Sequence, residues 1–152
     1  MGWLRLWWPA LAWAAVIWTF STSLFSAENT SRVIVPVLHW VFPHAVMATL
    51  VKIHYLVRKC GHFTEYFILS LLILRGIRAG RREMHLSSAL LAILMIAAYA
   101  ALDEFHQRFV PGRTPAVSDA LLDTTGGIAA QILAAVLAWR VSAREQESVE
   151  SA

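Results

Sequence analysis

Four long apolar stretches constrain the fold of this chain more than any other feature. They cover approximately residues 7–25, 59–74, 86–105 and 115–139. A helix of about 20 apolar residues spans the hydrocarbon core of a bilayer, and each stretch is close to that length. A helix also satisfies its own backbone hydrogen bonds, which lipid cannot do. We therefore predict an all-α integral membrane helical bundle with four transmembrane helices.

Composition supports this class. The chain has 152 residues, of which 58% are hydrophobic, whereas soluble domains are about 45–50% apolar. We predict a single transmembrane domain over residues 1–143 and a polar cytoplasmic tail over residues 144–152. The formal charge of +3 comes from basic residues in short loops, so we expect no nucleic-acid partner. Cys60 is the single cysteine, which excludes an internal disulfide.

The connection between the first two stretches is apolar but interrupted. Residues 26–55 contain Pro36 and Pro43, and proline breaks or kinks a helix. We predict one or two short interfacial or re-entrant helices here. The alternative is a fifth transmembrane span.

Loop charges predict the orientation. With four spans, the N-terminus, the loop after the second span and the C-terminus share one side of the membrane. That side carries these basic residues: Arg5, Arg75, Arg78, Arg81, Arg82, Arg140 and Arg144. The other side carries Arg32 and Lys52, apart from basic residues that belong to polar clusters. The positive-inside rule therefore predicts cytoplasmic termini in a multi-pass protein of the plasma membrane.

A stripe of ionisable residues precedes the second apolar stretch. Arg58, His62 and Glu65 lie at i, i+4 and i+7, so a helix places them on one face. A charge at the bilayer centre costs about 2.5–3.5 kcal/mol on insertion scales. Ionisable residues at such positions indicate a functional site.

Further polar residues fall at the same, extracytoplasmic end of the predicted bundle. Ser21 and Ser23 end the first span, and the ends of the last two spans supply Asp103, Glu104, His106, Gln107, Arg113, Asp119 and Asp123. Pro111-Gly112 has the order of a type II turn, and Thr114 with Pro115 fits a helix start. Such a short connection holds two antiparallel helices together. We expect one shared polar pocket.

Three kinds of chemistry fit this pocket. The pairs His62–Glu65 and Asp103–His106 have the i, i+3 spacing of helix-borne metal ligands. The nearby arginines would repel a cation, so we expect neither a metal nor a cofactor. Hydrolysis or group transfer is the second possibility. Its candidate catalytic residues are His62, Glu65, Asp103 and His106, with Ser21 or Ser23 as nucleophile.

The third possibility is structural. Ion pairs between Arg58 and Glu65 and between Arg113 and Asp119 would neutralise the charges and hold the helices together. Such glue needs far fewer ionisable groups than this cluster contains, which favours a site. Deeper in the last span, we predict that Gly126 and Gly127 permit close helix packing and that Gln131 bonds a neighbouring helix. His54 is expected to be solvated or to cap a helix near the interface rather than to act as a ligand.

Three motifs in order resemble the VanZ-like family. They are Arg-Lys-x-x-His-Phe-x-Glu-Tyr from Arg58, Asp-Glu-x-His-Gln-x-Phe-Val-Pro-Gly-Arg from Asp103, and Asp-x-x-x-Asp from Asp119 followed by two glycines. The resemblance covers nearly the whole chain. It implies a small multi-span membrane protein, in a family named after an accessory protein associated with teicoplanin resistance.

Together these observations predict a function in the cell envelope. We expect a pocket that recognises an envelope lipid or a lipid-linked cell-wall component and affects glycopeptide susceptibility. The expected ligand-binding residues are Arg58, His62, Glu65, Asp103, Glu104, His106, Gln107, Arg113, Asp119 and Asp123. The expected partners are membrane lipids. The alternative is an intramembrane hydrolase or transferase acting on a lipid-linked substrate.

Overall fold

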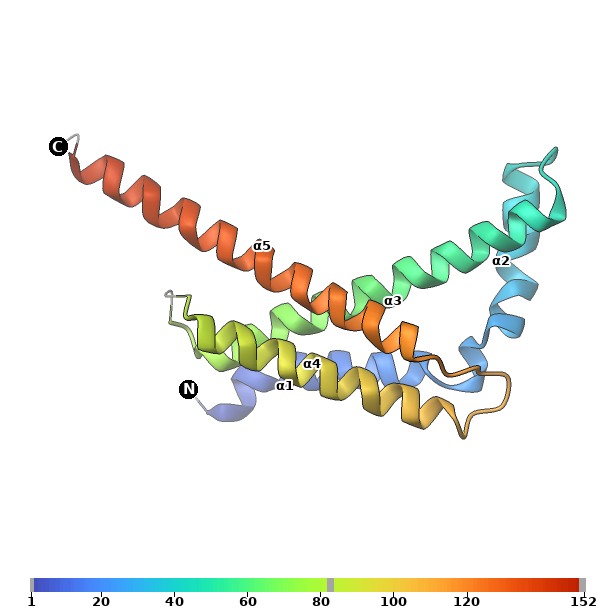
Figure 1. Cartoon of the computed structure of the whole chain (residues 1–152), viewed down its shortest axis with the longest axis horizontal. Helices are drawn as coiled ribbons and strands as arrows, with labels where there is room; N and C mark the ends of the chain where they lie inside the picture. The colour runs from blue at the N-terminus through green and yellow to red at the C-terminus, as the bar shows by residue number, and fades with distance from the viewer. Residues whose placement is uncertain (1, 82–83, 151–152) are drawn as a thin grey trace.

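A computed structural model describes residues 2–81 and 84–150, with side chains to residue 147 at the C-terminal end (Figure 1). Arg82, counted above for the orientation, and the last two residues of the tail lie outside the described residues. The elements are α1 (Trp3–Phe20), the 3-10 turn η1 (Ser23–Phe25), α2 (Ala27–Val41), α3 (Met47–Arg78), α4 (Leu86–Gln107) and α5 (Val117–Glu150). The described residues form no strand, so the predicted all-α class is confirmed.

Three helices are each long and apolar enough to cross a membrane: α3, α4 and residues Val117–Glu147 of α5. The helix α1 meets the same requirement only when it is joined to the following segment Ser23–Val41, which comprises η1 and α2. The chain bends by 67° between α1 and that segment. Among the described residues the structure thus offers three spans, or up to four. The predicted count of four is not confirmed, and the alternative fifth span finds no support.

The helix α3 begins 12 residues before the predicted second span. The boundaries predicted for the connection 26–55 are therefore wrong, since Met47 already belongs to α3. No proline follows Pro43 until after α3 has ended, so nothing stops the helix. Its 32 residues extend about 48 Å, more than the hydrocarbon core requires. The N-terminal part of α3 therefore projects from the bundle together with α2 (Figure 1).

The helix α2 forms most of the predicted interfacial segment. Pro36 lies inside it and does not end it. Val33, Val37, Trp40 and Val41 lie at i, i+4, i+7 and i+8, and all four are exposed. Such an apolar stripe suits contact with lipid, so location in the membrane interface remains our prediction for α2.

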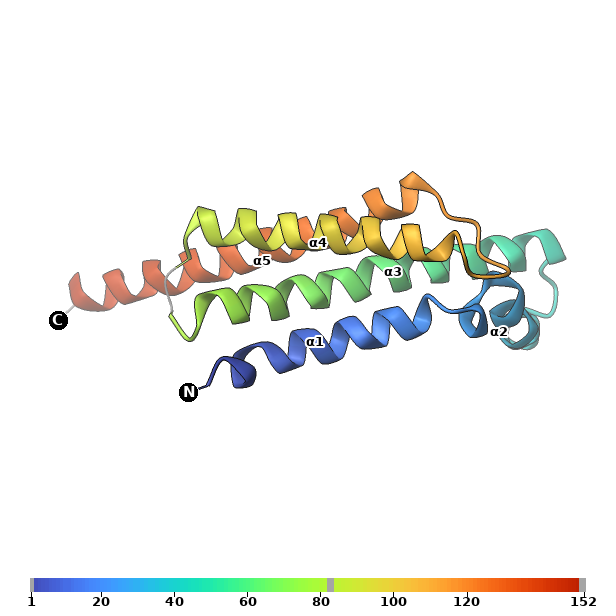
Figure 2. The ribbon, with the colours of Figure 1, turned by 90° about the horizontal axis from the view of Figure 1, so that it is seen from below.

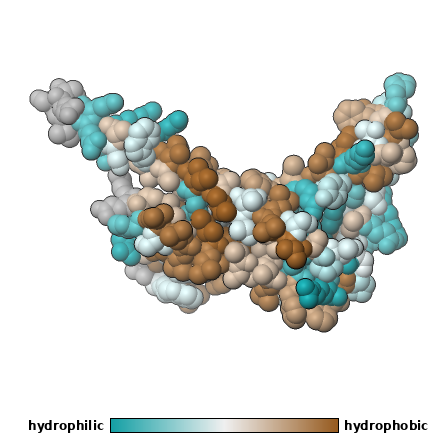
Figure 3. Space-filling model, viewed as in Figure 1, coloured by the Kyte–Doolittle hydropathy of each residue, from teal (hydrophilic) through white to brown (hydrophobic). Residues whose placement is uncertain are grey.

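The helix α3 is the centre of the bundle and contacts α1, α2, α4 and α5. In Figure 2, α1 and α4 run along α3 on different sides. Tyr66 and Leu69 of α3 are buried against Ile17 of α1 and Ile96 of α4. Apolar residues also remain outside: hydrophobic atoms cover much of the face over α4 and α5 in Figure 3, whereas hydrophilic atoms gather towards the C-terminal part of α5. This distribution suits a bundle surrounded by lipid.

Two glycines let α5 approach its neighbours, as predicted. A Cβ atom on Gly126 would lie 2.4 Å from the backbone oxygen of Phe63 in α3. A Cβ atom on Gly127 would lie 2.7 Å from Cγ2 of Ile96 in α4. Dispersion between closely packed surfaces stabilises helix pairs in lipid, where no hydrophobic effect drives them together.

A buried hydrogen-bond network joins α3 to α5. Ser70 Oγ donates to the backbone oxygen of Gly127 at 3.0 Å. Gln131 Nε2 donates to Ser70 Oγ at 2.7 Å and to Ser70 O at 3.2 Å. The prediction that Gln131 bonds a neighbouring helix is confirmed.

We expect Ser70→Ala to lower the free energy of unfolding by about 1 kcal/mol, since two interhelical bonds of about 0.6 kcal/mol each are lost. Reversible unfolding in a denaturing detergent measures the change. The control is Ser87→Ala at an exposed position of α4, for which we expect almost no change. Equal stabilities of the two variants would contradict a contribution from this network.

The connection between α4 and α5 contains the predicted turn. Arg113 N donates to Val110 O at 3.2 Å, and Gly112 has a φ of 76°. This left-handed conformation at the third residue is the type II requirement that glycine meets. The helix α5 begins at Val117 rather than at Pro115, so the predicted start is two residues early.

Candidate functional site

Two adjoining cavities lie where α1, α2 and α3 meet the α4–α5 connection. The first has a volume of about 220 Å³ and the second about 200 Å³. Polar residues of the first cavity are Ser21, Thr30, Arg58, His62, Glu65, Asp103 and Arg113. Its apolar wall includes Ile17, Phe20, Phe25, Ile34 and Val57. Arg58, His62 and Arg113 line both cavities. The predicted convergence of polar groups at one end of the bundle is therefore present.

The second cavity is more polar and lies beside an ion pair. It is lined by Lys59, Gln107 and Asp119 in addition to the three shared residues. Lys59 Nζ is paired with Asp119 Oδ1. This pair joins α3 to the first turn of α5.

The two arginines bind backbone carbonyl groups rather than carboxylates. Arg58 Nη1 donates to Phe25 O at 2.8 Å and to Thr30 Oγ1 at 3.0 Å. Arg113 donates from Nε and Nη2 to Thr22 O, at 3.4 and 3.2 Å, and from Nη2 to Phe20 O. Burial and the nearby Arg58 lower the pKa of the Arg113 guanidinium from its ordinary value.

The suggested structural ion pairs are therefore absent from the described residues. Neither Arg58–Glu65 nor Arg113–Asp119 comes within salt-bridge distance there. The reason lies at the ends of α1 and η1, because the last carbonyl groups of a helix lack intrahelical partners. Arg113 donates to the carbonyl group of Phe20, the last residue of α1, and Arg58 donates to that of Phe25, the last residue of η1.

A histidine–carboxylate contact lies behind the cavity wall. His62 Nδ1 is 3.6 Å from Asp123 Oδ1, beyond a normal hydrogen bond. The Asp123 side chain is fully buried, and both of its oxygens lack a hydrogen-bond partner among the described residues. Asp123 contacts a residue of the cavity and does not line it.

Three residues that line the first cavity, Ser21, His62 and Asp103, carry buried polar atoms without a hydrogen-bond partner among the described residues. Asp103 is 1% exposed; its Oδ2 accepts a hydrogen bond from Gln107 Nε2 at 2.9 Å, whereas no described residue bonds its Oδ1. Ser21 is 2% exposed, and no described residue bonds its Oγ. Such atoms cost about 1–3 kcal/mol each when left unsatisfied. Ser21, His62 and Asp103 therefore bring unsatisfied polar groups to the wall of one cavity.

Besides Asp123, two more of the predicted site residues, Glu104 and His106, lie outside both cavities. Glu104 Oε2 accepts a hydrogen bond from Ala116 N at 2.8 Å and so fixes the residue before α5. The ring of His106 stacks on Trp18 of α1 with centroids 4.0 Å apart. Sequence spacing placed His106 on the face of Asp103, but the neighbouring tryptophan holds its ring.

Sequence reasoning missed the part that α2 plays. Thr30 Oγ1 contacts His54 Nε2 at 3.1 Å and accepts from Arg58, and Ile34 adds to the apolar wall. His54 is buried, so the expectation that it is solvated was wrong. The amphipathic pattern of α2 was visible, but nothing in it indicated which helix it would cover.

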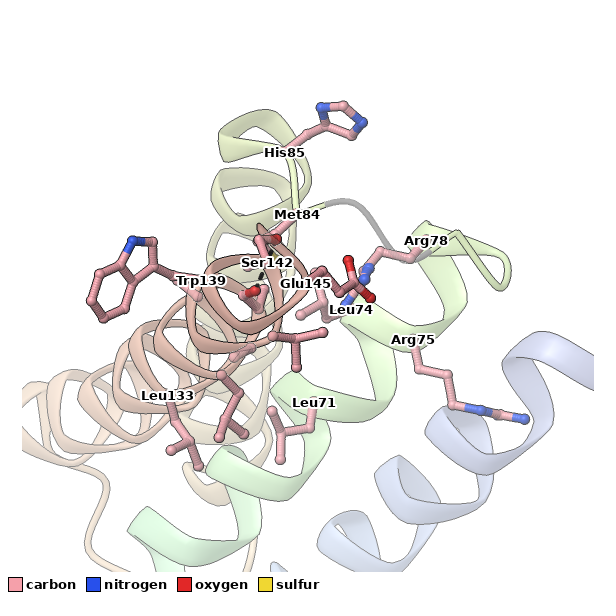
Figure 4. A pocket seen from close by; sticks show the side chains of 15 residues that line it. Leu71, Leu74, Arg75, Arg78, Met84, His85, Leu133, Trp139, Ser142 and Glu145 are labelled. Atoms are coloured by element: carbon pink, nitrogen blue, oxygen red, sulfur yellow. Dashed lines mark hydrogen bonds between the residues drawn. The ribbon is translucent and has the colours of Figure 1, made fainter. Parts of the chain in front are cut away.

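A further and more voluminous cavity lies at the opposite end of the bundle, between α3, α5 and the residues just before α4 (Figure 4). Its volume is about 1110 Å³, and leucines and alanines form nearly half of its wall. Arg75 points towards α1, where its Nη1 donates to Leu6 O at 3.2 Å. None of the predicted ligand-binding residues lines this cavity.

The described residues bring no three His, Cys, Asp or Glu side chains together in an arrangement that could hold a metal ion. Of the candidate i, i+3 pairs, His62 and Glu65 both line the first cavity, whereas His106 stacks on Trp18 and lines neither cavity with Asp103.

Comparison with known proteins identifies the family. No curated protein and no solved structure is similar enough to match this chain. The family model described as VanZ/LLP1 matches residues 6–138, which include both cavities and all the polar residues predicted for the site. Together with helices apolar enough to span a membrane, this match supports a multi-pass membrane protein. The three motifs therefore resembled the correct family, and the chain belongs to the VanZ/LLP1 family.

Proposed function

We propose that this chain recognises an envelope lipid, or a lipid-linked cell-wall component, and thereby affects glycopeptide susceptibility. The first cavity is the binding site, and it opens towards the extracytoplasmic side of the plasma membrane. The observation that carries the proposal is the cavity's composition. Ser21 and Asp103, each with a buried and unpartnered polar atom, line the same cavity as the apolar residues Phe20, Phe25 and Val57.

An amphiphile satisfies both halves of such a wall. Ligand sites commonly combine apolar surface with a few placed polar groups. Phe20, Phe25 and Val57 are also partly exposed on the outside of the bundle, so an acyl or prenyl chain can continue from the cavity into the bilayer. Ionisable residues gathered at one end of a membrane bundle are expensive, which favours a functional role.

The hydrolase or transferase alternative receives less support. Ser21 Oγ, the candidate nucleophile that lines the cavity, has no base within hydrogen-bond distance among the described residues. Nucleophilic catalysis by serine requires such a base. His106 is stacked on Trp18 outside the cavity.

The proposal predicts a phenotype for cavity variants. In a glycopeptide-susceptible bacterial host, we expect the wild-type chain to change the minimal inhibitory concentration of teicoplanin. The single variants His62→Ala, Glu65→Gln and Asp103→Asn should abolish that change, because each alters a polar group of the cavity wall. The measurement is susceptibility at protein amounts matched by quantitative immunoblotting of the membrane fraction.

The matched control is Glu28→Gln, which changes an exposed carboxylate at the start of α2. It should retain the wild-type effect. If all three cavity variants retained it at matched amounts, the proposed site would be wrong. If they instead lost the folded protein, the polar cluster would have a structural role.

A further inference from the structure

The polar groups of the first cavity carry both signs of charge. Arg58 and Arg113 line it together with Glu65 and Asp103. A simple anion site would not contain the carboxylates, and a simple cation site would not contain the arginines. Because the arginines and carboxylates are not paired with one another within salt-bridge distance, both remain able to contact a ligand.

The arginines retain hydrogen-bond donors. The bonds of Arg58 to Phe25 and Thr30 use Nη1 alone, so no described residue accepts from its Nε or Nη2. The bonds of Arg113 use Nε and Nη2, and no described residue accepts from Nη1. Guanidinium groups suit phosphate oxygens because several N–H donors lie in one plane. The backbone bonds hold both groups in place for such a contact.

The acceptors lie in the same space. Asp103 Oδ1 is buried and unpartnered, and Gln107 holds the other oxygen of this carboxylate. Glu65 adds a second carboxylate to the wall, and Ser21 Oγ adds a buried hydroxyl. A group with several N–H donors and a positive charge would satisfy these acceptors. A primary ammonium group fits this description.

We propose that the ligand of this cavity carries a phosphate and a primary ammonium group on one headgroup, as an aminophospholipid such as phosphatidylethanolamine does. The inference rests on the proposed function and specifies its ligand class. The phosphate lies between Arg58 and Arg113, and the ammonium group contacts Asp103 and Glu65. The cavity of about 220 Å³ equals the liquid volume of about seven waters, enough for a small headgroup but not for a large glycan.

The test uses the purified full-length protein in detergent and a series of synthetic lipids with identical acyl chains. The series runs from phosphatidylethanolamine through its N-methyl and N,N-dimethyl forms to phosphatidylcholine, and includes phosphatidylglycerol. Successive methyl groups remove N–H donors while the positive charge stays. We expect affinity to fall along the series, by about tenfold or more at phosphatidylcholine, as loss of a charged hydrogen bond predicts. Native mass spectrometry or ligand-induced thermal stabilisation measures it.

Two variants and one soluble compound sharpen the test. Asp103→Asn should remove the preference for phosphatidylethanolamine over phosphatidylcholine, with Glu65→Gln as a second variant if the first does not fold. The exposed Glu28→Gln should keep the preference. Soluble phosphoethanolamine at the same concentration should produce little stabilisation, because it lacks the acyl chains that contact Phe20 and Val57. Strong binding of the soluble compound would overturn the assignment to a lipid.

The outcomes separate this inference from the function on which it rests. If all the lipids bound equally well and Arg58→Gln weakened them all, recognition of a lipid would stand while the ammonium contact would be wrong. If phosphatidylglycerol bound most tightly, the ligand would be anionic, and the inference would likewise fail. If no lipid bound the wild-type protein, the proposed function would fail as well.

Discussion

Replacing Gly126 with alanine is expected to prevent α5 from packing on α3. The new Cβ atom would lie 2.4 Å from the backbone oxygen of Phe63, and a helix backbone cannot move aside as a flexible side chain can. Overpacking costs about 1–3 kcal/mol and occasionally more in well-packed proteins. Because α3 and α5 must separate along their contact, we expect at least the upper part of that range. The measurement is the free energy of unfolding in a denaturing detergent, together with the amount of monodisperse protein after solubilisation.

Two other glycines supply graded controls. Gly127→Ala places a Cβ atom 2.7 Å from a side-chain atom of Ile96, which can shift, so we expect a smaller loss of stability. Gly61→Ala meets nothing within 4 Å and lies inside α3, where alanine favours the helix more than glycine does. We therefore expect Gly61→Ala to be the most stable of the three variants, Gly127→Ala to be intermediate and Gly126→Ala to be the least stable. A Gly126→Ala protein as stable as the Gly61→Ala protein would contradict the close approach of α5 to α3.

Helix identity was predictable where apolar residues run without interruption. The helix α4 was expected over residues 86–105 and extends over Leu86–Gln107, because hydropathy and helix formation coincide there. They diverge in α3. Its N-terminal third has polar residues and the stripe from Arg58, which ended the apolar pattern without breaking the helix. Hydropathy therefore placed the start of the span at residue 59, whereas the absence of proline allowed the helix to start at Met47.

The convergence of the polar residues was predictable from topology alone. Antiparallel helices joined by short connections bring the end of one beside the start of the next, which placed Asp103, Arg113 and Asp119 together. Individual partners were not predictable in this way. Lys59 rather than Arg113 pairs with Asp119, and His106 stacks on Trp18. Which side chain makes such a contact depends on how each helix is rotated about its axis, because successive side chains point about 100° apart.

The backbone partners of the arginines had no signal in the sequence at all. Every helix end has carbonyl groups without intrahelical partners, and sequence does not reveal which side chain reaches them. The sharp turn after α1 directs two carbonyl groups, that of Phe20 at the helix end and that of Thr22 in the turn, towards the α4–α5 connection. From the sequence, an arginine in that connection is easily assigned to a carboxylate, because charged side chains can be read from a sequence and unpaired backbone carbonyl groups cannot.

Replacing Arg113 with methionine is expected to detach the α4–α5 connection from the end of α1. The guanidinium group donates to two carbonyl groups at once, those of Phe20 and Thr22. Hydrogen bonds from charged donors contribute about 1.5–3 kcal/mol each, and the two carbonyl groups would lose them. We expect Arg113→Met to lower the free energy of unfolding by about 2 kcal/mol or more on this basis. The change should also make the connection more accessible to limited proteolysis, a local readout that global stability alone does not give.

Lysine at the same position separates the geometry of the donor from its charge. Arg113→Lys keeps the positive charge but not the planar group that reaches both carbonyl groups, so its stability should fall between those of the wild type and Arg113→Met. The control is Arg108→Met, which removes an exposed arginine from the same connection and should leave both readouts almost unchanged. If Arg113→Lys matched the wild type, charge alone would suffice and the two-carbonyl contact would not matter. If Arg113→Met were as stable as Arg108→Met, Arg113 would not hold the connection. The turn and the hydrogen bond from Ala116 N to Glu104 would then suffice, and ligand binding would be the remaining role of Arg113.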